Sequence, residues 1–463
     1  MSSNKILTLQ QILKAENNFI AKKSHEELIN FAGKKVGNFL YKNFKHKKIL
    51  FICGFGNNGM DGIIAASFLK DKKIDCDIFD ISKVTFYEEK FTLNLLEKYQ
   101  VLVDCVFGTG LNKRVNGGLK KIIEKINNSK KYIISIDLPS GTKCDTGQIL
   151  GISVKANLTL CLGFYKPAHF LLPGKTQSGE KKIINLNLTV PAKLKPSVNL
   201  IDSGVCNFLP KFKSSCHKYD KGHVLVLGGQ MAGASRIVAL VSRKIGCGLS
   251  TIAVHENNLK YYNGVEVGTI IQEVSDDLLK KKDVLVLGPG LGKGFDTKQI
   301  IHLIEKFEGP IVIDADAISI FKDQKKLFYQ IIKKKQNVVL TPHEGEFKRL
   351  FSHSEESKLQ NCLKASKLIN NSIVHKGNDT VVCLNNGSLW INDNATERLA
   401  TAGTGDILCG LIAGLIAQKM NFRKAILAAV HIQGELSQIK KNITAEDFIG
   451  SITKTLLKLK NNN

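Results

Sequence analysis

Several aspartates in this chain stand in or beside glycine-rich loops, where a carboxylate could transfer protons. The clearest is Asp406, which ends ATAGTGD just before an apolar stretch. Gly403 and Gly405 allow a tight turn whose backbone N–H groups point outwards at a helix start, forming an anion site without a lysine. Asp406 beside a bound phosphate or departing oxygen could act as general base or acid. The alternative interpretation is a glycine turn with Asp406 stabilised by the helix dipole.

Glycine-rich segments also follow the other apolar runs of the second half, in VLVLGGQMAGASRI, VLVLGPGLGKG, LTPHEGEF and VHKGNDTVV. None carries the GK[ST] ending, which excludes a P-loop. His343 and Lys376 each have an ordinary structural interpretation. Their positions at predicted strand ends nevertheless favour ligand contact, and Lys376 followed by Gly377 suits a phosphate.

The first half carries a different loop, GFGNNGMDG, directly after an apolar strand. It contains G-x-G-x-x-G, and Asp80 ends the next strand, as in a dinucleotide-binding dehydrogenase. That alternative stays open, but Asp61 sets a carboxylate where a pyrophosphate would otherwise bind. The structural interpretation of this segment is a tight turn with Asp61 as a helix cap.

Polar side chains also end two further strands, in VDCVFGTGL and SIDLPSG. Because the carboxyl ends of neighbouring parallel strands converge on one crevice, Asp104, Asp137 and Ser140 can meet there. Asn58, Asp104 and Ser140 offer oxygens suited to a hard cation, whereas Asp137 could transfer protons.

Nearly continuous apolar strands separated by helical stretches must position these loops, which indicates parallel sheets covered on both faces. The first forty residues have apolar positions at helical spacing and predict one or two helices before the first sheet. The strand rhythm breaks near residues 191–196 and restarts at 223, and 463 residues exceed what one core usually serves. We therefore expect an α/β protein of two three-layer α/β/α domains, 1–210 and 211–463.

Composition limits the possible partners and compartments. The net charge is +25, but the basic residues are nearly all lysines spread along the chain, without a concentrated stripe. We therefore expect attraction for anionic small molecules and no nucleic-acid partner, with RNA binding as the non-enzymatic alternative. The 11 cysteines show no CxxC spacing, as in reduced, buried thiols. No long apolar run or signal sequence is present, so we expect a cytoplasmic protein that contacts no membrane.

The N-terminal motifs NNGMDG, VDCVFGTGL and DLPSG resemble the NAD(P)H-hydrate epimerase family, also called the YjeF N-terminal domain, over about residues 1–205. The resemblance implies a Rossmann-like sheet that binds hydrated NADH and NADPH (NADHX and NADPHX). It also implies K⁺ held by Asn58, Asp104 and Ser140. The family usually has glycine where Met60 stands, so a side chain is expected to enter the loop. LCLGFYKPAHFLLPG (160–174) matches a further, less specific family element. The implied substrate contacts are Asn57, Asn58, Gly59, Met60, Asp61, Gly108, Thr109, Gly110, Leu111, Asn112, Lys113, Arg114 and Asp137.

The motifs of the second half resemble the ribokinase-like superfamily and, within it, the ADP-dependent NAD(P)H-hydrate dehydratase family, over about residues 215–455. The family usually has an Asn-Pro-type element before ATAGTGD, where this chain has Glu397 and Arg398. Residues implied to face the hydrated nucleotide are Ala234, Gly290, Gly292, His343 and Asp406. Residues implied to bind the adenine nucleotide are Lys376, Gly377, Asn378, Asp379, Thr380 and Gly405.

Together the two resemblances imply a bifunctional nicotinamide-nucleotide repair enzyme and a homo-oligomer. One domain would interconvert the R and S epimers with Asp137, and the other would dehydrate the S epimer with Asp406. ADP is the expected phosphate donor, with Mg²⁺, and ATP is the alternative. Phosphorylation would turn the hydroxyl group into a better leaving group. The enzymatic rival is a small-molecule kinase of the hydroxymethylpyrimidine or sugar type, against which the NNGMDG domain argues.

Overall fold

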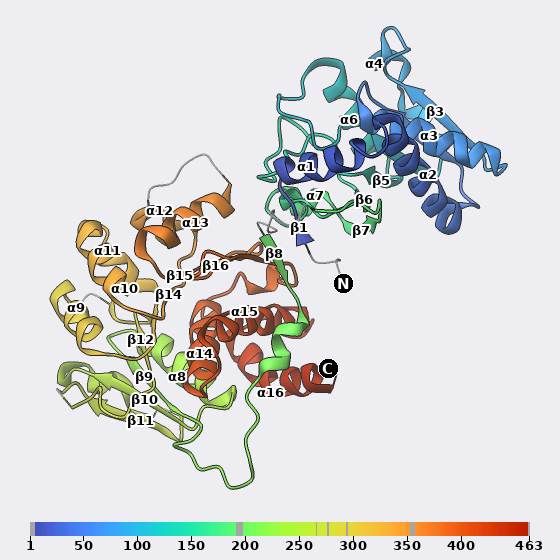
Figure 1. Cartoon of the computed structure of the whole chain (residues 1–463). Coiled ribbons are helices and arrows are strands. Elements are labelled where there is room, and N and C mark those ends of the chain that lie inside the picture. Colours follow the sequence, from blue (N-terminus) through green and yellow to red (C-terminus); the bar gives the residue numbers. More distant parts are fainter. Residues whose placement is uncertain are drawn as a thin grey trace. The chain divides into compact units, whose positions relative to one another are not determined.

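The computed structural model describes residues 5–190, 198–264, 266–275, 277–292, 295–351 and 357–461. The chain divides into two compact units, Met1–Asn199 and Leu200–Asn463 (Figure 1). The sequence places residues 200–210 with the first domain, whereas Cys206 and Leu209 are buried in the hydrophobic core of the second unit. These residues therefore belong with the second unit.

The first unit is built on a parallel sheet with the strand order β3-β2-β4-β5-β6-β7. Alternate residues of one strand face opposite sides: Phe51 packs with α2 and α3, whereas Ile52 packs with α6. The strands of this unit are β2 (Ile49–Cys53), β3 (Cys76–Asp80), β4 (Val101–Cys105), β5 (Tyr132–Ile136), β6 (Leu158–Leu162) and β7 (Glu180–Ile184), with β1 (Lys5–Ile6) pairing the start of β8 (Val198–Ile201).

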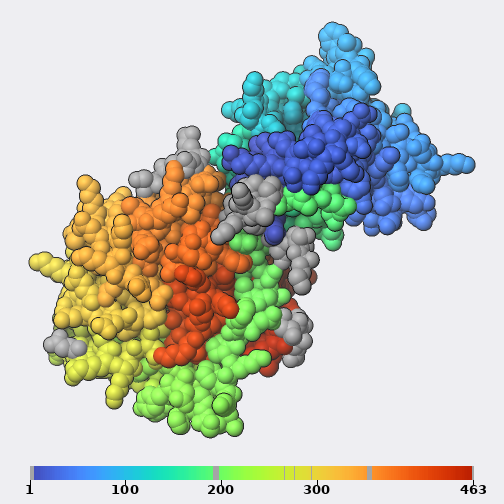
Figure 2. Space-filling view, in the orientation of Figure 1, coloured from blue at the N-terminus to red at the C-terminus, as the bar shows by residue number. Residues whose placement is uncertain are grey.

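Helices cover both faces of this sheet, and two of them precede it as the sequence predicts. Their dark blue atoms occupy much of the visible face of the first unit (Figure 2). The 12 residues of α1 bury Ile12 and Ala15, so the helix lies against the sheet edge that carries the loops. The helices are α1 (Leu9–Ile20), α2 (His25–Phe44), α3 (Asn57–Asp71), α4 (Tyr87–Lys90), α5 (Leu93–Glu97), α6 (Gly117–Asn128), η1 (Pro167–His169) and α7 (Gly174–Gln177).

The second unit contains a longer sheet that includes the order β17-β16-β15-β14-β13-β12-β9-β10-β11. The strands from β15 to β11 in this order run parallel, and the hairpin partners β16 and β17 run antiparallel. The strands are β9 (His223–Leu227), β10 (Leu249–Val254), β11 (Thr269–Glu273), β12 (Val284–Leu287), β13 (Ile311–Ile313), β14 (Val338–Leu340), β15 (Ser372–His375), β16 (Val381–Cys383) and β17 (Leu389–Asn392).

One face of this second sheet packs against α8, α14, α15 and α16, whereas α13 contacts β15 and β16 outside that cluster. The expected α/β fold, with helices around parallel sheets, is confirmed. The helices are η2 (Ser203–Phe208), α8 (Ala232–Lys244), η3 (Glu256–Tyr262), α9 (Thr297–Lys306), α10 (Ala315–Ser319), α11 (Lys325–Lys334), α12 (Glu344–Leu350), α13 (Lys358–Ile369), η5 (Glu397–Leu399), α14 (Thr404–Ala417), α15 (Phe422–Gln438) and α16 (Ala445–Asn461).

Strand register brings the loops of each sheet to one edge. In the first unit Cys53 lies opposite Cys105, and Asp104 lies opposite Ser135, so the loops after β2, β4 and β5 leave side by side. In the second unit Ile313 lies between Leu287 and Leu340. Among the described residues, no helix is long and apolar enough to cross a membrane.

Two candidate active sites

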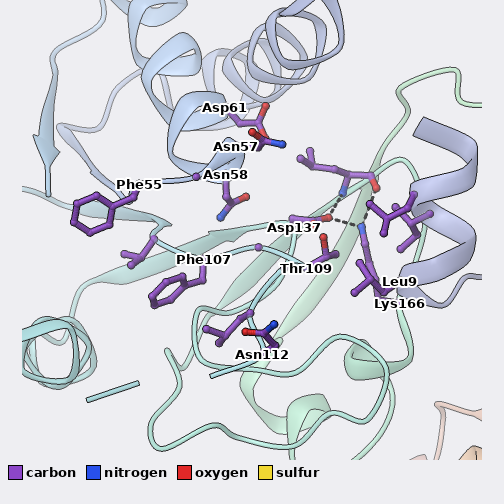
Figure 3. A pocket seen from close by; sticks show the side chains of 18 of the residues that line it. Leu9, Phe55, Asn57, Asn58, Asp61, Phe107, Thr109, Asn112, Asp137 and Lys166 are labelled. Atoms are coloured by element: carbon purple, nitrogen blue, oxygen red, sulfur yellow. Dashed lines mark hydrogen bonds and ion pairs between the residues drawn. The ribbon is translucent and has the colours of Figure 1, made fainter. Parts of the chain in front are cut away.

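The first unit contains a pocket of about 860 Å³ at the carboxyl edge of its sheet (Figure 3). It is walled by α1, by the loops after β2 and β4, and by the end of β5. The predicted substrate residues that line it are Asn57, Asn58, Asp61, Gly108, Thr109, Gly110, Leu111, Asn112, Lys113, Arg114 and Asp137. The structure therefore brings together most of the predicted set.

The expectation that the Met60 side chain enters the loop is wrong. Helix α3 begins at Asn57, and Met60 points outwards with 47 % of its surface exposed. The tight contact lies instead at Gly59, where a β-carbon would come 2.1 Å from the carbonyl oxygen of Gly54. Neither Gly59 nor Met60 is among the pocket-lining residues. The Met60 side chain therefore lies outside the pocket.

Asp137, directly after β5, has an unusual backbone conformation, with φ of 67°. This left-handed region is strained for a residue other than glycine and persists only when the surroundings impose it. Its N–H donates to the carbonyl oxygen of Leu160 at 2.8 Å, and its own carbonyl oxygen lies 2.8 Å from Nε2 of His169. The neighbouring strand and a buried histidine therefore fix Asp137 at the pocket wall.

The Asp137 carboxylate forms an ion pair with Lys166, whose side chain is only 1 % exposed. Nζ of Lys166 also donates to the carbonyl oxygen of Leu162 at 2.8 Å. Burial alone would lower the pKa of this amine, but the charge and hydrogen bond of Asp137, together with the thiols of Cys161 and Cys144, outweigh burial and raise the pKa. Burial and the Lys166 charge lower the pKa of His169 well below its usual value. The neutral ring therefore donates through Nε2 to Asp137 and accepts the Lys166 backbone N–H through Nδ1.

Two further carboxyl groups, Glu16 of α1 and Asp61 of α3, line the same pocket. Burial, and then the Asp137 charge, raise the pKa of Glu16 to about 7, although Lys166 opposes the shift. Burial, Asp137 and Glu16 raise the pKa of Asp61 well above its usual value. The buried Oδ1 of Asp61 has no hydrogen-bond partner. Glu16 can therefore hold and release a proton near neutral pH beside Asp137 and Lys166.

The predicted cation ligands lie next to this pocket. Asp104 is fully buried, and its oxygens accept hydrogen bonds from Ser135 Oγ, Ser140 Oγ, Ser140 N and Val106 N at 2.6–3.2 Å. All four donors are neutral, and burial raises the pKa of Asp104. The buried amide nitrogen of Asn58 has no hydrogen-bond partner. The Asp104 carboxylate is thus buried without a counter-charge, and carboxylate and hydroxyl oxygens are the ligands that a hard cation prefers.

Asp80, the ribose ligand of the dehydrogenase alternative, takes no part in this pocket. Its carboxylate accepts a 2.6 Å hydrogen bond from Ser82 Oγ and pairs with Lys83 at 3.4 Å. It is absent from the pocket lining, so the glycine loop does not present the ribose site of a dehydrogenase.

In the second unit, Gly403 caps α14 with φ of 85°, and Asp406 lies in the first helical turn. A β-carbon on Gly405 would lie 3.3 Å from Nζ of Lys376 and 3.7 Å from Oδ2 of Asp314. Helix starts leave backbone N–H groups unpaired, and this one stands beside a buried ammonium. Burial, then Asp314, raise the pKa of Asp406 to about 7, while Lys376 opposes the shift.

Lys376 is held by carboxylates that have no part in the predicted set. Its Nζ lies 2.6 Å from Oδ1 of Asp314 and 3.9 Å from Oε2 of Glu346. Cys409 Sγ donates to the other Asp314 oxygen at 3.2 Å. Burial would lower the pKa of Lys376, but the carboxylates outweigh it and raise the pKa. Lys376, which was predicted to bind a phosphate, thus lies beside the glycine turn, and its ion pair with Asp314 holds its ammonium group in place.

Several of the residues predicted to face the hydrated nucleotide lie close to one another. A β-carbon on Gly290 (φ 72°) would lie 3.2 Å from Cβ of Ala234. Gly292 N donates to Oδ2 of Asp316 at 2.9 Å, and the Asp316 charge also raises the pKa of Asp406. The loops after β12 and β13 therefore approach the start of α14.

The remaining predicted residues make local structural contacts. His343 caps α12, its Nδ1 accepting from Gly345 N at 2.9 Å, and its side chain is 52 % exposed. Asp379 pairs with Lys358 at 2.6 Å, and Thr380 Oγ1 donates to Gly377 O at 2.6 Å. These bonds shape the turn after β15, of which Asn378 is also part. Arg398 donates to Ser437 O at 3.4 Å, at the end of α15.

Sequence reasoning missed Glu16, Lys166, Asp314 and Asp316. Lys166 lies in LCLGFYKPAHFLLPG, which the family resemblance singled out without assigning roles to its residues. Asp314 and Asp316 follow β13 in IVIDAD, a strand end like those of the other site residues. Glu16 had no local signal, because it lies within an ordinary amphipathic helix.

Comparisons with known proteins agree with both halves. A family model described as NAD(P)H-hydrate dehydratase matches residues 224–460, and the YjeF-related protein N-terminus matches residues 25–95 and 77–168. A curated bifunctional NAD(P)H-hydrate repair enzyme of Dictyoglomus turgidum is 30 % identical over 88 % of this chain and 89 % of its own. That of Thermofilum pendens is 28 % identical over 87 % and 85 %.

Among solved structures, a ribokinase-like superfamily protein of Enterococcus faecalis shares the fold of the second unit. It has a TM-score of 0.50 and 22 % identity, and covers 57 % of this chain and 98 % of its own. With the two family matches and the full-length relatives, the outcome is clear: this chain belongs to the family of bifunctional NAD(P)H-hydrate repair enzymes, with an epimerase domain at its amino end and a dehydratase domain at its carboxyl end.

Proposed function

We propose that Asp137 transfers the proton in epimerisation and that Asp406 transfers it in dehydration. The observation that carries both assignments is shared by the two units. Asp137 directly follows β5 and Asp406 lies in the first turn of α14, and each is influenced by a lysine charge, that of Lys166 or Lys376. The surrounding carboxyl groups have pKa values suited to proton exchange near neutral pH.

Epimerisation inverts a ring carbon that bears a hydroxyl group and is bonded to the ring nitrogen. Asp137 accepts the hydroxyl proton as the carbon–nitrogen bond opens to an aldehyde, and passes this proton to the ring nitrogen. Closure of the nitrogen on the opposite face of the aldehyde reverses the proton transfer. The Lys166 ammonium, which forms an ion pair with the Asp137 carboxylate, holds that carboxylate in place at the pocket wall. The polar loop residues 57–61 and 108–114 hold the substrate beside it, with the amides of Asn57, Asn58 and Asn112 lining the pocket.

We assign the K⁺ site of the epimerase domain to Asn58, Asp104 and Ser140. The support is the burial of the Asp104 carboxylate without a counter-charge, next to the hydroxyl oxygen of Ser140. A bound cation would add a positive charge beside the loop that contacts the substrate. Ser140, which donates to Asp104 at 2.6 Å, orients the carboxylate for it.

For dehydration, the hydroxyl oxygen of the S epimer attacks the terminal phosphorus of the nucleotide while Asp406 takes up the hydroxyl proton. The nucleotide leaves one phosphate shorter. Loss of a proton from the adjacent carbon then forms the ring double bond and expels inorganic phosphate, which yields NADH or NADPH. The amide groups at the start of α14 and the Lys376 charge stabilise the transferring phosphate.

We assign the nucleotide to the residues after β15 and the start of α14: Lys376, Gly377, Asn378, Asp379, Thr380 and Gly405. The family resemblance favours ADP as the donor and ATP as the alternative. Among the described residues no group of His, Cys, Asp and Glu is arranged to hold a metal ion, so Mg²⁺ would arrive on the nucleotide phosphates. Ala234, Gly290, Gly292 and His343 would face the hydrated substrate.

The direct experiment incubates NADH hydrate with the protein and either ADP or ATP, and follows the recovery of reduced-nicotinamide absorbance. Asp406→Asn should abolish recovery while the R and S epimers still interconvert at the wild-type rate. The matched control is Asp323→Asn, at an exposed position of the same unit. Recovery by the Asp406 variant would contradict its role, and equal loss of both activities would contradict separate sites.

We also propose a cytoplasmic location and a homo-oligomeric assembly. All 11 cysteines are free, and apart from Cys216 they are buried, which suits a reducing compartment. Sedimentation of the full chain at several concentrations tests the assembly.

A further inference from the structure

Two phenylalanines occupy equivalent positions in the loops of the epimerase pocket. Strands β2 and β4 are paired so that Cys53 lies opposite Cys105, and Phe55 and Phe107 each follow two residues later. Both line the pocket. Phe107 is backed by the hydrophobic cluster on the α6 face of the sheet, whereas Phe55 is 64 % exposed. The pocket therefore has one fixed aromatic wall and one projecting ring.

Figure 3 shows both rings at the end of the pocket away from Asp137 and Lys166. The ionisable groups Glu16, Asp61 and Asp137 interact with one another and with Lys166, so the reacting ring belongs at their end. The pocket thus separates a proton-transferring end from an aromatic end. Lys113 and Arg114, which also line it, supply positive charge for phosphates.

The chemistry of the substrate indicates what the aromatic end receives. Hydration saturates part of the nicotinamide ring, which then lacks an aromatic face. Adenine is the only aromatic ring left in the hydrated dinucleotide. Aromatic side chains stack on bases with a gain of about 1–3 kcal/mol per base, and a strongly exposed phenylalanine in a pocket suits that use.

We propose that Phe55 and Phe107 bind the adenine ring of the hydrated dinucleotide by stacking, and so make the epimerase selective for dinucleotides over hydrated mononucleotides. This inference rests on the proposed placement of the reacting ring at Asp137. It makes the two phenylalanines specificity-determining residues: they hold the distant end of the substrate and touch no reacting atom.

The test measures epimerisation of two substrates, hydrated NADH and the hydrated reduced nicotinamide mononucleotide, by chromatographic separation of the R and S epimers. Phe55→Ala and Phe107→Ala should each raise KM for the dinucleotide by about tenfold, with kcat nearly unchanged. KM for the mononucleotide should stay at the wild-type value. Phe55→Trp should restore the low KM, because a larger aromatic ring still stacks.

Phe86→Ala is the matched control, because Phe86 is also exposed, at 70 %, but lies outside the pocket lining. Equal KM increases for both substrates would overturn the proposal, since the rings would then contact the reacting half. Unchanged KM for the dinucleotide would also overturn it. Failure of the role proposed for Asp137 is a separate result, because Asp137→Asn would then epimerise at the full rate. The comparison of the two substrates can still be made in that case.

Discussion

The ammonium nitrogen of Lys376 lies 2.6 Å from Oδ1 of Asp314, beside the glycine turn that carries Asp406. Asp314 is buried and the Lys376 side chain is only 17 % exposed, so both charges act on Asp406 through little solvent. Burial and Asp314 raise the pKa of Asp406 to about 7, and Lys376 limits the rise. A carboxyl group poised there can accept a proton from a hydroxyl group and release it later in the same cycle.

The pH dependence of dehydration should report Asp406. If its ionised form is the base, kcat/KM rises as pH increases through about 7. Asp316→Asn removes a negative charge that raises the pKa of Asp406, yet retains an oxygen for the Gly292 N–H. The rising limb should therefore move to lower pH by a fraction of a unit. A rising part of the kcat/KM profile that stays in place, or moves to higher pH, would contradict the coupling between Asp316 and Asp406. Asp323→Asn is the control and should leave the profile unchanged.

Glu16 should lower the stability of the protein above neutral pH. Its pKa is raised from 4.5 to about 7 in the folded protein, so the folded state holds a proton that the unfolded state loses. The resulting stability is present at acidic pH and disappears as pH rises through about 7. Glu16→Gln should therefore raise Tm above that pH, by a few degrees, and change it little in acid.

Thermal unfolding at pH values on both sides of neutrality measures this difference. Glu124→Gln, at an exposed position on α6, serves as the control and should show no pH-dependent gain. A Glu16 variant whose Tm difference from the wild type is the same in acid and in base would refute the account.

Potassium should act on epimerisation alone. Replacing K⁺ by tetramethylammonium should slow interconversion of the epimers and leave dehydration of the S epimer unchanged. Ser140→Ala removes a hydroxyl group that orients Asp104, and should weaken K⁺ binding by about tenfold or more. The rise of Tm with KCl gives a readout independent of activity.

Ser129→Ala removes a hydroxyl group at the end of α6 and is the matched control. The K⁺ site would be contradicted if the Tm and the epimerisation rate of the wild-type protein were the same in K⁺ and in tetramethylammonium.

The glycine loops and strand ends were predictable because their signals are local. The apolar runs that end at Asp104 and Asp137 predict both the strand and the sheet edge at which these side chains lie, and the glycine turn before Asp406 predicts a helix start. Met60 shows the limit of such reading. A substitution inside the motif suggested crowding, but the start of α3 at Asn57 turns that side chain outwards.

Lys166, the carboxyl group of Glu16 and the pairing of Lys376 with Asp314 were not predictable, although Lys376 itself was predicted as a phosphate ligand. Lys166 meets Asp137 across 29 positions, and Lys376 meets Asp314 across 62. In a chain rich in lysine, nothing local distinguishes a buried amine from the exposed ones. Glu16 reaches the pocket because α1 packs against the sheet edge, a tertiary contact without a motif. These residues belong to the sites because of contacts with residues far away in the sequence, and residue type alone does not reveal such contacts.

The division of labour between Asp137 and Asp406 is tested most directly by one time course. A mixture of R and S NADH hydrates is given to Asp137→Asn with ADP and Mg²⁺, and reduced-nicotinamide absorbance is followed to completion. Recovery should be rapid up to the S fraction and then continue only at the spontaneous epimerisation rate, measured without enzyme. Rapid, complete recovery from both epimers would contradict the assignment of epimerisation to Asp137.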